Sequence, residues 1–327
     1  MTVLVTGGAG YIGSHTVRLL RERGREVVVL DSLELGHRAA VLDAPLVVGR
    51  VDDEPLVEKL VEEFGVDAVI HFAAYKSAGE SMHEPEKYFR NNVGGSLGLL
   101  EALRRSGVRR FVFSSTAATY GTPETLPVPE GHALAPESPY GESKLMVERI
   151  LHWYDTAHDL RSVSLRYFNA AGASRDARIG EDSSTTTNLI PLVMKAALGR
   201  LPALSVFGTD YPTSDGTAIR DYIHVDDLAD AHLKALEYLE HDGATTVINV
   251  GTGTGSSVQD VIDMVRKVSG VEIPVSYVGR RAGDPVAVYA DNRKARELLG
   301  WLPDHSFENV VASAWAWHST HPDGYVE

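Results

Sequence analysis

Apolar runs of strand length alternate with segments of helical period along the first half of the chain. Residues 2–6 (TVLVT) and 26–30 (EVVVL) are short β-branched runs, and residues 11–23 between them carry apolar side chains at helical spacing. The same two patterns recur downstream. They predict strands at 46–48, 67–72, 109–114, 162–166 and 246–250, and helices at about 54–64, 86–106, 141–158, 188–198, 226–240 and 257–269.

The alternation weakens after about residue 170. Segments rich in Gly, Pro, Ser and Thr, such as 172–187 and 208–218, then separate the helices. Strands that alternate with helices form a doubly wound parallel sheet. We therefore expect an α/β fold with a Rossmann-type, dinucleotide-binding domain over residues 1–170 and later returns to it near 221–250. A smaller C-terminal α/β lobe over 171–327 is expected mainly to bind substrate.

Composition narrows the partners. The 327 residues are 43% hydrophobic and 23% charged, as in an ordinary globular protein, and the formal net charge is −14. An acidic chain is a poor match for a broad nucleic-acid or membrane surface, so we expect neither partner. There is no cysteine, which excludes disulfides and thiolate nucleophiles, and the histidines lack metal-ligand spacing, so we expect no metal site. No basic leader precedes the first apolar run, and we expect a cytoplasmic protein.

A glycine-rich turn joins the first strand to the first helix. Gly7 allows a tight turn, Gly10 lets a pyrophosphate approach the backbone, and Gly13 lets the helix pack on the sheet. Asp31 follows the second strand, where a carboxylate can bind both ribose hydroxyls of NAD and would repel the 2′-phosphate of NADP. Each feature alone is also typical of an ordinary turn, but the two at this spacing predict NAD.

A phenol and an ammonium group are paired at the start of a predicted helix. Tyr140 and Lys144 are four residues apart, so their side chains share one helix face. A tyrosine with a pKa near 10 is a poor base at neutral pH, but a lysine and an oxidised nicotinamide beside it favour the phenolate. Thr116 follows the predicted strand 109–114, at the edge where ligands of such sheets bind. We expect Tyr140 to accept a proton there, and Thr116 to hold the reacting oxygen.

Several longer motifs resemble the extended short-chain dehydrogenase/reductase family and, within it, the 4-epimerases of UDP-hexoses. The similarity covers essentially the whole chain. Its motifs are GGAGYIG at 7–13, HFAA at 71–74, Lys76, NNV at 91–93, SPYGESKLMVE at 138–148, YFNAAGA at 167–173, RDYIHVDDLADAH at 220–232 and RRAGDP at 280–285.

The resemblance implies roles for the matching residues. Tyr140 would be the base, Lys144 would lower its pKa and bind the nicotinamide ribose, and Thr116 would bridge the 4-hydroxyl of the sugar. The cofactor site would contain Gly7, Gly10, Tyr11, Ile12, Gly13, Asp31, Ser32, Val51, Phe72, Ala73, Ala74, Lys76, Asn91, Ser114, Tyr140, Lys144 and Phe168. The sugar nucleotide would meet Lys76, Thr116, Tyr140, Asn169, Asn188, Leu189, Phe207, Arg220, Arg281, Asp284 and Val288. The two arginines are forked donors of the kind that a diphosphate needs.

The implied reaction interconverts UDP-galactose and UDP-glucose. The sugar is oxidised at C4, the 4-keto intermediate rotates, and the hydride returns to its other face. NAD is regenerated in each cycle, so we expect it to stay tightly bound. The resemblance also implies a homodimer packed through helices near 88–105 and 141–158.

Three positions depart from the family pattern. Ser32 stands where asparagine is more usual, and Arg50 stands where an acid commonly meets the adenine, so both affect the adenosine contacts. Val288 matches a position that is tyrosine in some of these epimerases and small in others. Because valine leaves room beside C2 of the sugar, we expect N-acetylated UDP-hexoses to be accepted as well.

Two other functions fit parts of this pattern. A nucleotide-sugar dehydratase or decarboxylase of the same family would share the cofactor site, but the dehydratases carry an Asp-Glu pair where Ala117 and Ala118 stand. A non-enzymatic NAD sensor could share the fold, although such proteins typically lose the Tyr/Lys pair that is present here.

Overall fold

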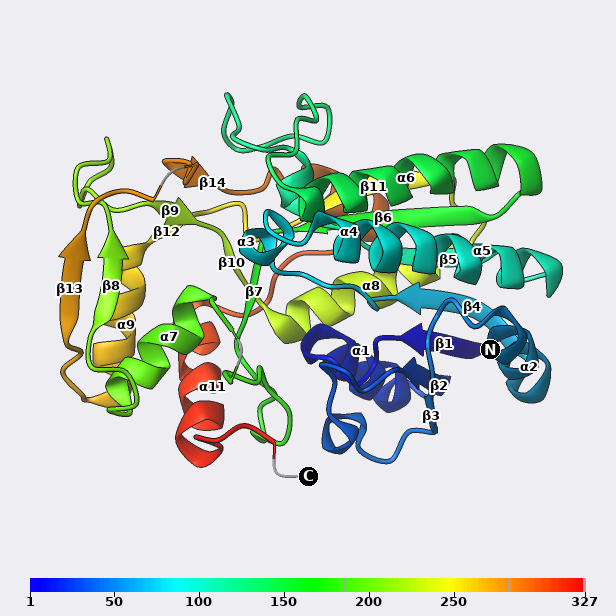
Figure 1. Cartoon of the computed structure of the whole chain (residues 1–327), viewed down its shortest axis with the longest axis horizontal. Helices are drawn as coiled ribbons and strands as arrows, with labels where there is room; N and C mark the ends of the chain where they lie inside the picture. Colours follow the sequence, from blue (N-terminus) through cyan, green and yellow to red (C-terminus); the bar gives the residue numbers. More distant parts are fainter. Residues whose placement is uncertain (185, 282, 326–327) are drawn as a thin grey trace.

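A seven-stranded parallel sheet dominates the computed structural model, which describes residues 1–184, 186–281 and 283–325 (Figure 1). Its strand order is β11-β6-β5-β4-β1-β2-β3, and each neighbouring pair is parallel. The strands are β1 (Thr2–Thr6), β2 (Glu26–Asp31), β3 (Leu46–Val48), β4 (Val66–His71), β5 (Arg110–Ser114), β6 (Arg161–Tyr167) and β11 (Thr246–Val250). From β1 the chain winds outward through β2 and β3 and then returns to β4 on the other side of β1. The expected doubly wound sheet is therefore confirmed.

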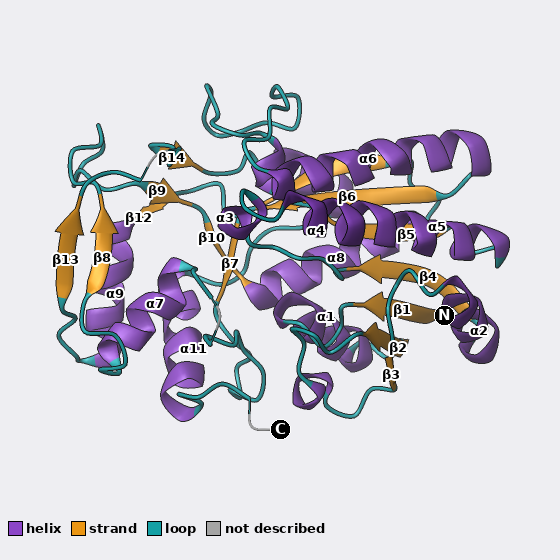
Figure 2. Cartoon of the chain, viewed as in Figure 1, coloured by secondary structure: helices purple, strands orange, loops and turns teal. Residues whose placement is uncertain are grey.

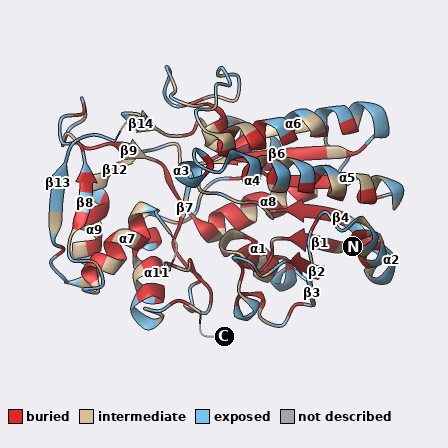
Figure 3. Cartoon of the chain, viewed as in Figure 1, coloured by how far each residue is buried: buried red, intermediate tan, exposed pale blue. Residues whose placement is uncertain are grey.

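Helices cover both faces of this sheet (Figure 2). The first face packs against α1 (Tyr11–Glu22) and α8 (Val225–Glu240), and the opposite face packs against α2 (Glu54–Phe64), α5 (Gly95–Arg105) and α6 (Pro139–His158). Successive side chains of a strand point to opposite faces. Accordingly, Val3 and Val5 of β1 belong to the first core, and Leu4 between them belongs to the second. Figure 3 shows that the central strands are mostly buried, while the edge strand β3 is partly exposed.

A second, smaller part of the chain lies beyond the carboxyl ends of the strands (Figure 1). Its own apolar core is formed by three helices and a parallel pair of strands. These are α7 (Leu189–Ala197), α9 (Val258–Ser269), α11 (Phe307–Thr320), β8 (Leu204–Phe207) and β13 (Val275–Val278). The C-terminal helices α10 (Arg293–Leu299) and α11 have no counterpart among the sequence-based expectations.

Short strands join the two parts. They form one parallel pair and one three-stranded sheet. They are β7 (Asn169–Ala171), β10 (Tyr222–His224), β9 (Ile219–Arg220), β12 (Ser256–Ser257) and β14 (Ala287–Val288), while the short helical turns are η1 (Arg38–Val41), α3 (Ala78–Ser81) and η3 (Ala117–Thr119). Strands of two or three residues carry too little periodicity to be read from a sequence.

The expected helix over 86–106 is wrong as a single α-helix. Residues 85–105 form α4 (Pro85–Tyr88), a π-helical stretch η2 (Phe89–Gly94) and then α5. In the π turn the Asn92 amide accepts a hydrogen bond from Tyr75 N at 3.0 Å and donates to Ser143 Oγ at 3.0 Å. Such insertions often occur at functional sites because they re-aim side chains. Here the π turn ties the segment after β4 to helix α6.

Candidate active site

The glycine turn forms the expected close contact between helix α1 and the sheet. A Cβ atom on Gly13 would lie 2.2 Å from the carbonyl oxygen of Gly7, so only glycine fits where the helix starts. The Asp31 carboxylate accepts hydrogen bonds from Ala9 N and Leu33 N, both at 2.9 Å. Each oxygen of a carboxylate can accept a further bond. Asp31 therefore shapes the turn and still faces the cavity beside it with free acceptor capacity.

A cavity at the carboxyl ends of the strands gathers most of the predicted cofactor residues. It is lined by Gly7, Gly10, Tyr11, Ile12, Gly13, Asp31, Ser32, Val51, Phe72, Ala73, Ala74, Lys76, Asn91, Ser114, Tyr140 and Lys144. Phe168 does not line it, because the chain turns away between β6 and β7. An elongated site with a glycine turn and a helix N-terminus at one side and a carboxylate nearby suits a dinucleotide. The residues present therefore fit NAD.

Tyr140 and Lys144 line this cavity, and Thr116 lies next to Tyr140. Helix α6 is capped by the Ser138 hydroxyl, which accepts from Gly141 N at 3.2 Å, and this fixes the first turn that carries Tyr140. A Cβ atom on Gly141 would lie 2.6 Å from the Ala118 carbonyl oxygen, so glycine lets the turn after β5 pack against the helix. The Thr116 hydroxyl lies near Tyr140 and lowers the pKa of the phenol, against the larger effect of burial.

Burial sets the proton affinities of the pair. It raises the pKa of Tyr140 well above 10, and neighbouring Tyr167 adds to this effect. It also lowers the pKa of Lys144 to about 7, against an opposing effect of Glu148. The Lys144 ammonium donates to the Ser114 carbonyl oxygen at 2.8 Å and lies over the Phe113 ring. A phenol that is buried away from water needs a neighbouring positive charge to ionise near neutral pH. A bound oxidised nicotinamide would supply that charge.

A buried ion pair lies next to the helical turn that carries Tyr140 and Lys144. Glu148 lies one helical turn after Lys144 and is bound in a bidentate manner by Arg166 of β6. It also accepts a hydrogen bond from Ser115 Oγ, next to Thr116. Arg166 in turn lies 4.8 Å from the centre of the Tyr120 ring. The sequence analysis missed this pair, although the spacing of Glu148 from Lys144 places both on one helix face.

Most of the other predicted sugar-nucleotide residues fall into three groups, and the first group adjoins the cofactor cavity through Lys76 and Glu181. In the first, Glu181 joins Lys76, whose ammonium lies at 3.5 Å, to Asn188, which donates at 2.8 Å. Leu189 follows Asn188 as the first residue of α7. Asn169 lies at the start of β7, on the strand that leads from the main sheet toward this group.

The other two groups come from the short strands. Val288 of β14 pairs with Arg220 of β9, and Arg220 contacts Asp284 at 3.5 Å. The Arg281 guanidinium lies 4.4 Å above the Phe207 ring. Ala282 of the same RRAGDP motif lies outside the described residues.

Several other residues that line the cavity were not among the predicted cofactor residues. They are Glu34, Leu35, Gly36, His37, Arg50, Tyr75, Tyr167, Gly180, Glu181, Asp182 and Tyr325. Arg50, which stands where an acid was expected, pairs with Asp52 at 2.9 Å, and Tyr75 donates to Glu34 across the cavity mouth. Residues 180–182 and 325 are too far along the chain from the glycine turn for any motif to connect them.

Comparison with known proteins agrees with this geometry. The profile of the NAD dependent epimerase/dehydratase family matches residues 3–251. The chain belongs to this family. A UDP-glucose 4-epimerase of Streptococcus mutans is 50% identical over 329 residues, which cover 99% of each chain.

Solved structures extend the comparison. A UDP-glucose 4-epimerase of Brucella ovis, solved with NAD, is 46% identical with a TM-score of 0.94, over 96% of this chain and 97% of that one. The UDP-Glc/GlcNAc 4-epimerase of Campylobacter jejuni is 41% identical with a TM-score of 0.87, over 98% and 99%. The resemblance to extended short-chain dehydrogenases/reductases is thus confirmed.

The described residues contain neither a helix that could span a membrane nor a cluster that could bind a metal ion. Within residues 1–184, 186–281 and 283–325, no helix has both the length and the apolar character that crossing a bilayer requires. In the same ranges, no cluster of three or more His, Asp or Glu side chains is arranged to hold a metal ion.

Proposed function

We propose that this chain interconverts UDP-galactose and UDP-glucose with NAD bound throughout the cycle. The observation that carries the proposal is that Tyr140 and Lys144 line a cavity that fits a dinucleotide, with Thr116 next to Tyr140. Full-length relatives at up to 50% identity, named UDP-glucose 4-epimerase, support it.

The side chains divide the work. Tyr140 takes the proton of the sugar's 4-hydroxyl, and the Thr116 hydroxyl holds the same oxygen. Lys144 holds the Ser114 carbonyl and adds positive charge beside the phenol when protonated. When bound, NAD supplies the acceptor and donor of the C4 hydride. After the 4-keto sugar has turned over, Tyr140 returns the proton to the oxygen.

The second part of the chain holds the nucleotide. Arg220 and Arg281 donate to the diphosphate, and the adjacent ring of Phe207 and the Asn169 and Asn188 amides serve the uridine and the sugar. We assign NAD mainly to residues 1–170, with returns near 221–250, and the sugar nucleotide mainly to residues 171–327. Val288 lies opposite Arg220 and leaves space beside C2, so N-acetylated hexoses are also substrates.

We also propose that the protein is a homodimer and that it lies in the cytoplasm. Leu97 of α5 is 43% exposed, and Met146 and Trp153 of α6 are 37% and 65% exposed. Helices α5 and α6 contact one another, and these apolar side chains are exposed on them. A second copy of the chain covers them in a homodimer. A chain without cysteines needs no disulfides, which is compatible with the cytoplasmic location that we propose.

Incubation of the purified protein with UDP-galactose and no added cofactor tests the main proposal. UDP-glucose formation, with NAD released on denaturation, supports it. A Tyr140→Phe variant is expected to lose 10²-fold or more of kcat, since general acid–base catalysis contributes about 10²–10⁴-fold. Wild-type turnover in that variant contradicts the assigned role.

The dehydratase alternative predicts different products. Ala117 and Ala118 occupy turn η3 beside Tyr140 and offer no acid or base for elimination. We therefore expect dTDP-glucose to give no 4-keto-6-deoxy sugar. Formation of that product, with UDP-galactose left unchanged, would replace the epimerase by a dehydratase.

A further inference from the structure

The C-terminal end of the chain reaches the cofactor cavity. Tyr325 lines this cavity together with Gly180, Glu181 and Asp182, all from the second part of the chain. His37 lines it from the first part, beyond the ribose acid Asp31. Walls contributed by two distant segments enclose a ligand only while those segments stay together.

The two walls touch at His37, in addition to the contact of Lys76 with Glu181 at 3.5 Å. The His37 Nε2 atom lies 2.9 Å from Asp182 Oδ2, and its ring stacks on Tyr325 with 4.6 Å between centroids and 23° between planes. The Tyr325 hydroxyl donates to the Gly180 carbonyl oxygen and accepts from Gly180 N, both at 3.0 Å. Tyr325 thus holds the 180–182 segment and His37 at once.

Each side of this contact is firmly anchored. His37 N donates to the Ala9 carbonyl oxygen of the glycine turn at 2.9 Å. Across from it, the indole of Trp317 on α11 donates to the Glu181 carbonyl oxygen at 2.9 Å, and a Cβ atom on Gly180 would lie 2.4 Å from the indole ring. The 180–182 segment therefore lies directly on helix α11.

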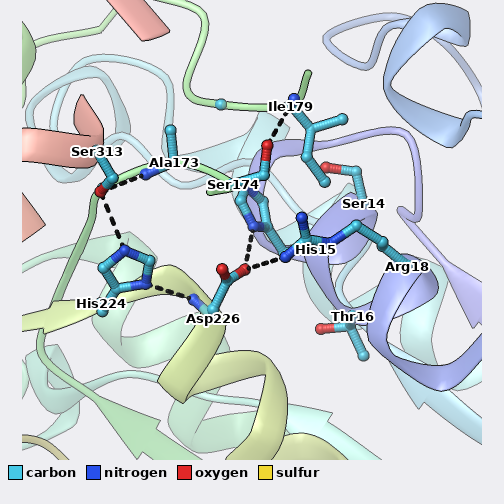
Figure 4. A network of polar contacts seen from close by, with 12 residues as sticks. Ser14, His15, Thr16, Arg18, Ala173, Ser174, Ile179, His224, Asp226 and Ser313 are labelled. Carbon is cyan, nitrogen blue, oxygen red and sulfur yellow. Dashed lines mark hydrogen bonds and ion pairs between the residues drawn. The ribbon is translucent and has the colours of Figure 1, made fainter. Parts of the chain in front are cut away.

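The stretch of chain that leads into the 180–182 segment starts at residues 172 and 173, which are tied to helices α1 and α11 (Figure 4). The Tyr11 hydroxyl donates to the Gly172 carbonyl oxygen at 2.7 Å. The Ser313 hydroxyl of α11 accepts from Ala173 N at 3.1 Å and lies 3.0 Å from His224, whose other nitrogen accepts from Asp226 N. Asp226 binds His15 and Arg18 of α1. With this end fixed, the walls can part at the His37 contact once the long, half-exposed contact of Lys76 with Glu181 opens.

We propose that Tyr325 and Asp182 clasp His37 over the cofactor cavity and that this clasp limits the rate at which NAD dissociates. The inference rests on the proposed function, in which a regenerated cofactor stays bound through many turnovers. Tyr325 and Asp182 are positioning residues for the cofactor, and neither takes part in the proton or hydride transfers. The clasp explains why the chain continues past α11 to Tyr325.

The test measures NAD release directly. Wild type and variants are loaded with radiolabelled NAD, chased with excess unlabelled NAD, and filtered at intervals. Tyr325→Phe removes the hydrogen bonds and keeps the stacked ring, so we expect release about two- to tenfold faster, as for the loss of one net hydrogen bond. Tyr325→Ala also removes the ring contact and is expected to release NAD about tenfold faster or more. Tyr277→Ala, on the exposed edge strand β13, is the matched control and should release NAD at the wild-type rate.

A double-mutant cycle separates a clasp from a general loosening. His37→Ala and Tyr325→Ala break the same contact, so the double variant should release NAD no faster than the faster single variant. Release rates that multiply, or variants that release NAD at the wild-type rate, overturn the clasp. If wild type retains no NAD and does not epimerise UDP-galactose, the proposed function itself fails; retention and turnover in wild type with unchanged variants sink the clasp alone.

Discussion

Glu148 and Arg166 form a bidentate ion pair between helix α6, which carries Tyr140, and strand β6, with the Arg166 Nε atom 2.9 Å from Glu148 Oε1. Both side chains are almost fully buried, at 5% and 4% exposure. The pair joins helix α6 to strand β6. Glu148 also accepts a hydrogen bond from Ser115, the residue that precedes Thr116. The pair therefore links the element that carries Tyr140 and Lys144 to the sheet.

Removal of one partner leaves the other charge buried. We expect Glu148→Ala to lower the free energy of unfolding by about 3–5 kcal/mol, as for other broken buried pairs, measured by urea denaturation. Glu86→Ala breaks the exposed pair with Arg90 and should cost less than about 1 kcal/mol. Equal small losses in both variants would show that the buried pair adds little to stability.

Acid should destabilise the protein through buried histidines such as His71. Burial, and then the charge of Lys144, lower the pKa of His71 to about 3, while its ring nitrogens contact Thr6 Oγ1 at 2.6 Å and Ser96 Oγ at 2.9 Å. The unfolded chain binds a proton below about pH 6.5 and the folded chain does not. The stability from neutral His71 is thus complete above about pH 6.5 and is lost as pH falls toward 3, by up to about 1.4 kcal/mol per pH unit.

His71→Gln removes this titration. Its free energy of unfolding should be lower than that of wild type at pH 7 and should fall less steeply between pH 6.5 and 4.5 in urea titrations. His241→Gln alters an exposed histidine on the surface and serves as the control. A His71→Gln slope equal to that of wild type would contradict the prediction.

Substrate range should depend on Val288. A tyrosine there would fill the space beside C2 of the sugar, next to Arg220. We expect Val288→Tyr to lose conversion of UDP-GalNAc to UDP-GlcNAc while it retains conversion of UDP-galactose, measured chromatographically for both substrates. Equal loss of both activities, or no loss, would show that Val288 does not set this selectivity.

The dimer should depend on Trp153. A charge at this exposed position on α6 would have to be buried in the proposed interface, so Trp153→Glu should convert a dimer to a monomer in light scattering after size exclusion. Tyr277→Glu on β13 introduces the same charge elsewhere and should leave the mass unchanged. A monomeric wild type would refute the assigned interface.

Apolar runs and local motifs were sufficient to predict the main sheet and part of the candidate site. Strands β1, β2 and β4 are apolar runs of the right length, and the glycine turn, Asp31, Tyr140 and Lys144 each lie at a strand end or helix start that the pattern marks. The prediction of a single α-helix over 86–106 was wrong because the apolar spacing of these residues is that of an ordinary helix. The π turn is instead imposed by the contacts of Asn92 with Tyr75 and Ser143. Helix α11 begins with a capping box of Ser306 and Asn309, a local signal that the sequence-based expectations did not use.

The sequence by itself determined the doubly wound sheet, the glycine turn and the placing of Tyr140 and Lys144 on one helix face, because strand alternation, close glycine contacts and helical spacing are local properties of the chain. Only the tertiary structure decided what surrounds them. It placed Glu148 on Arg166, Val288 opposite Arg220, and Tyr325 on His37, although Tyr325 and His37 lie at opposite ends of the sequence. Such pairs form because packing brings distant segments together, and no spacing along the chain records that distance in space.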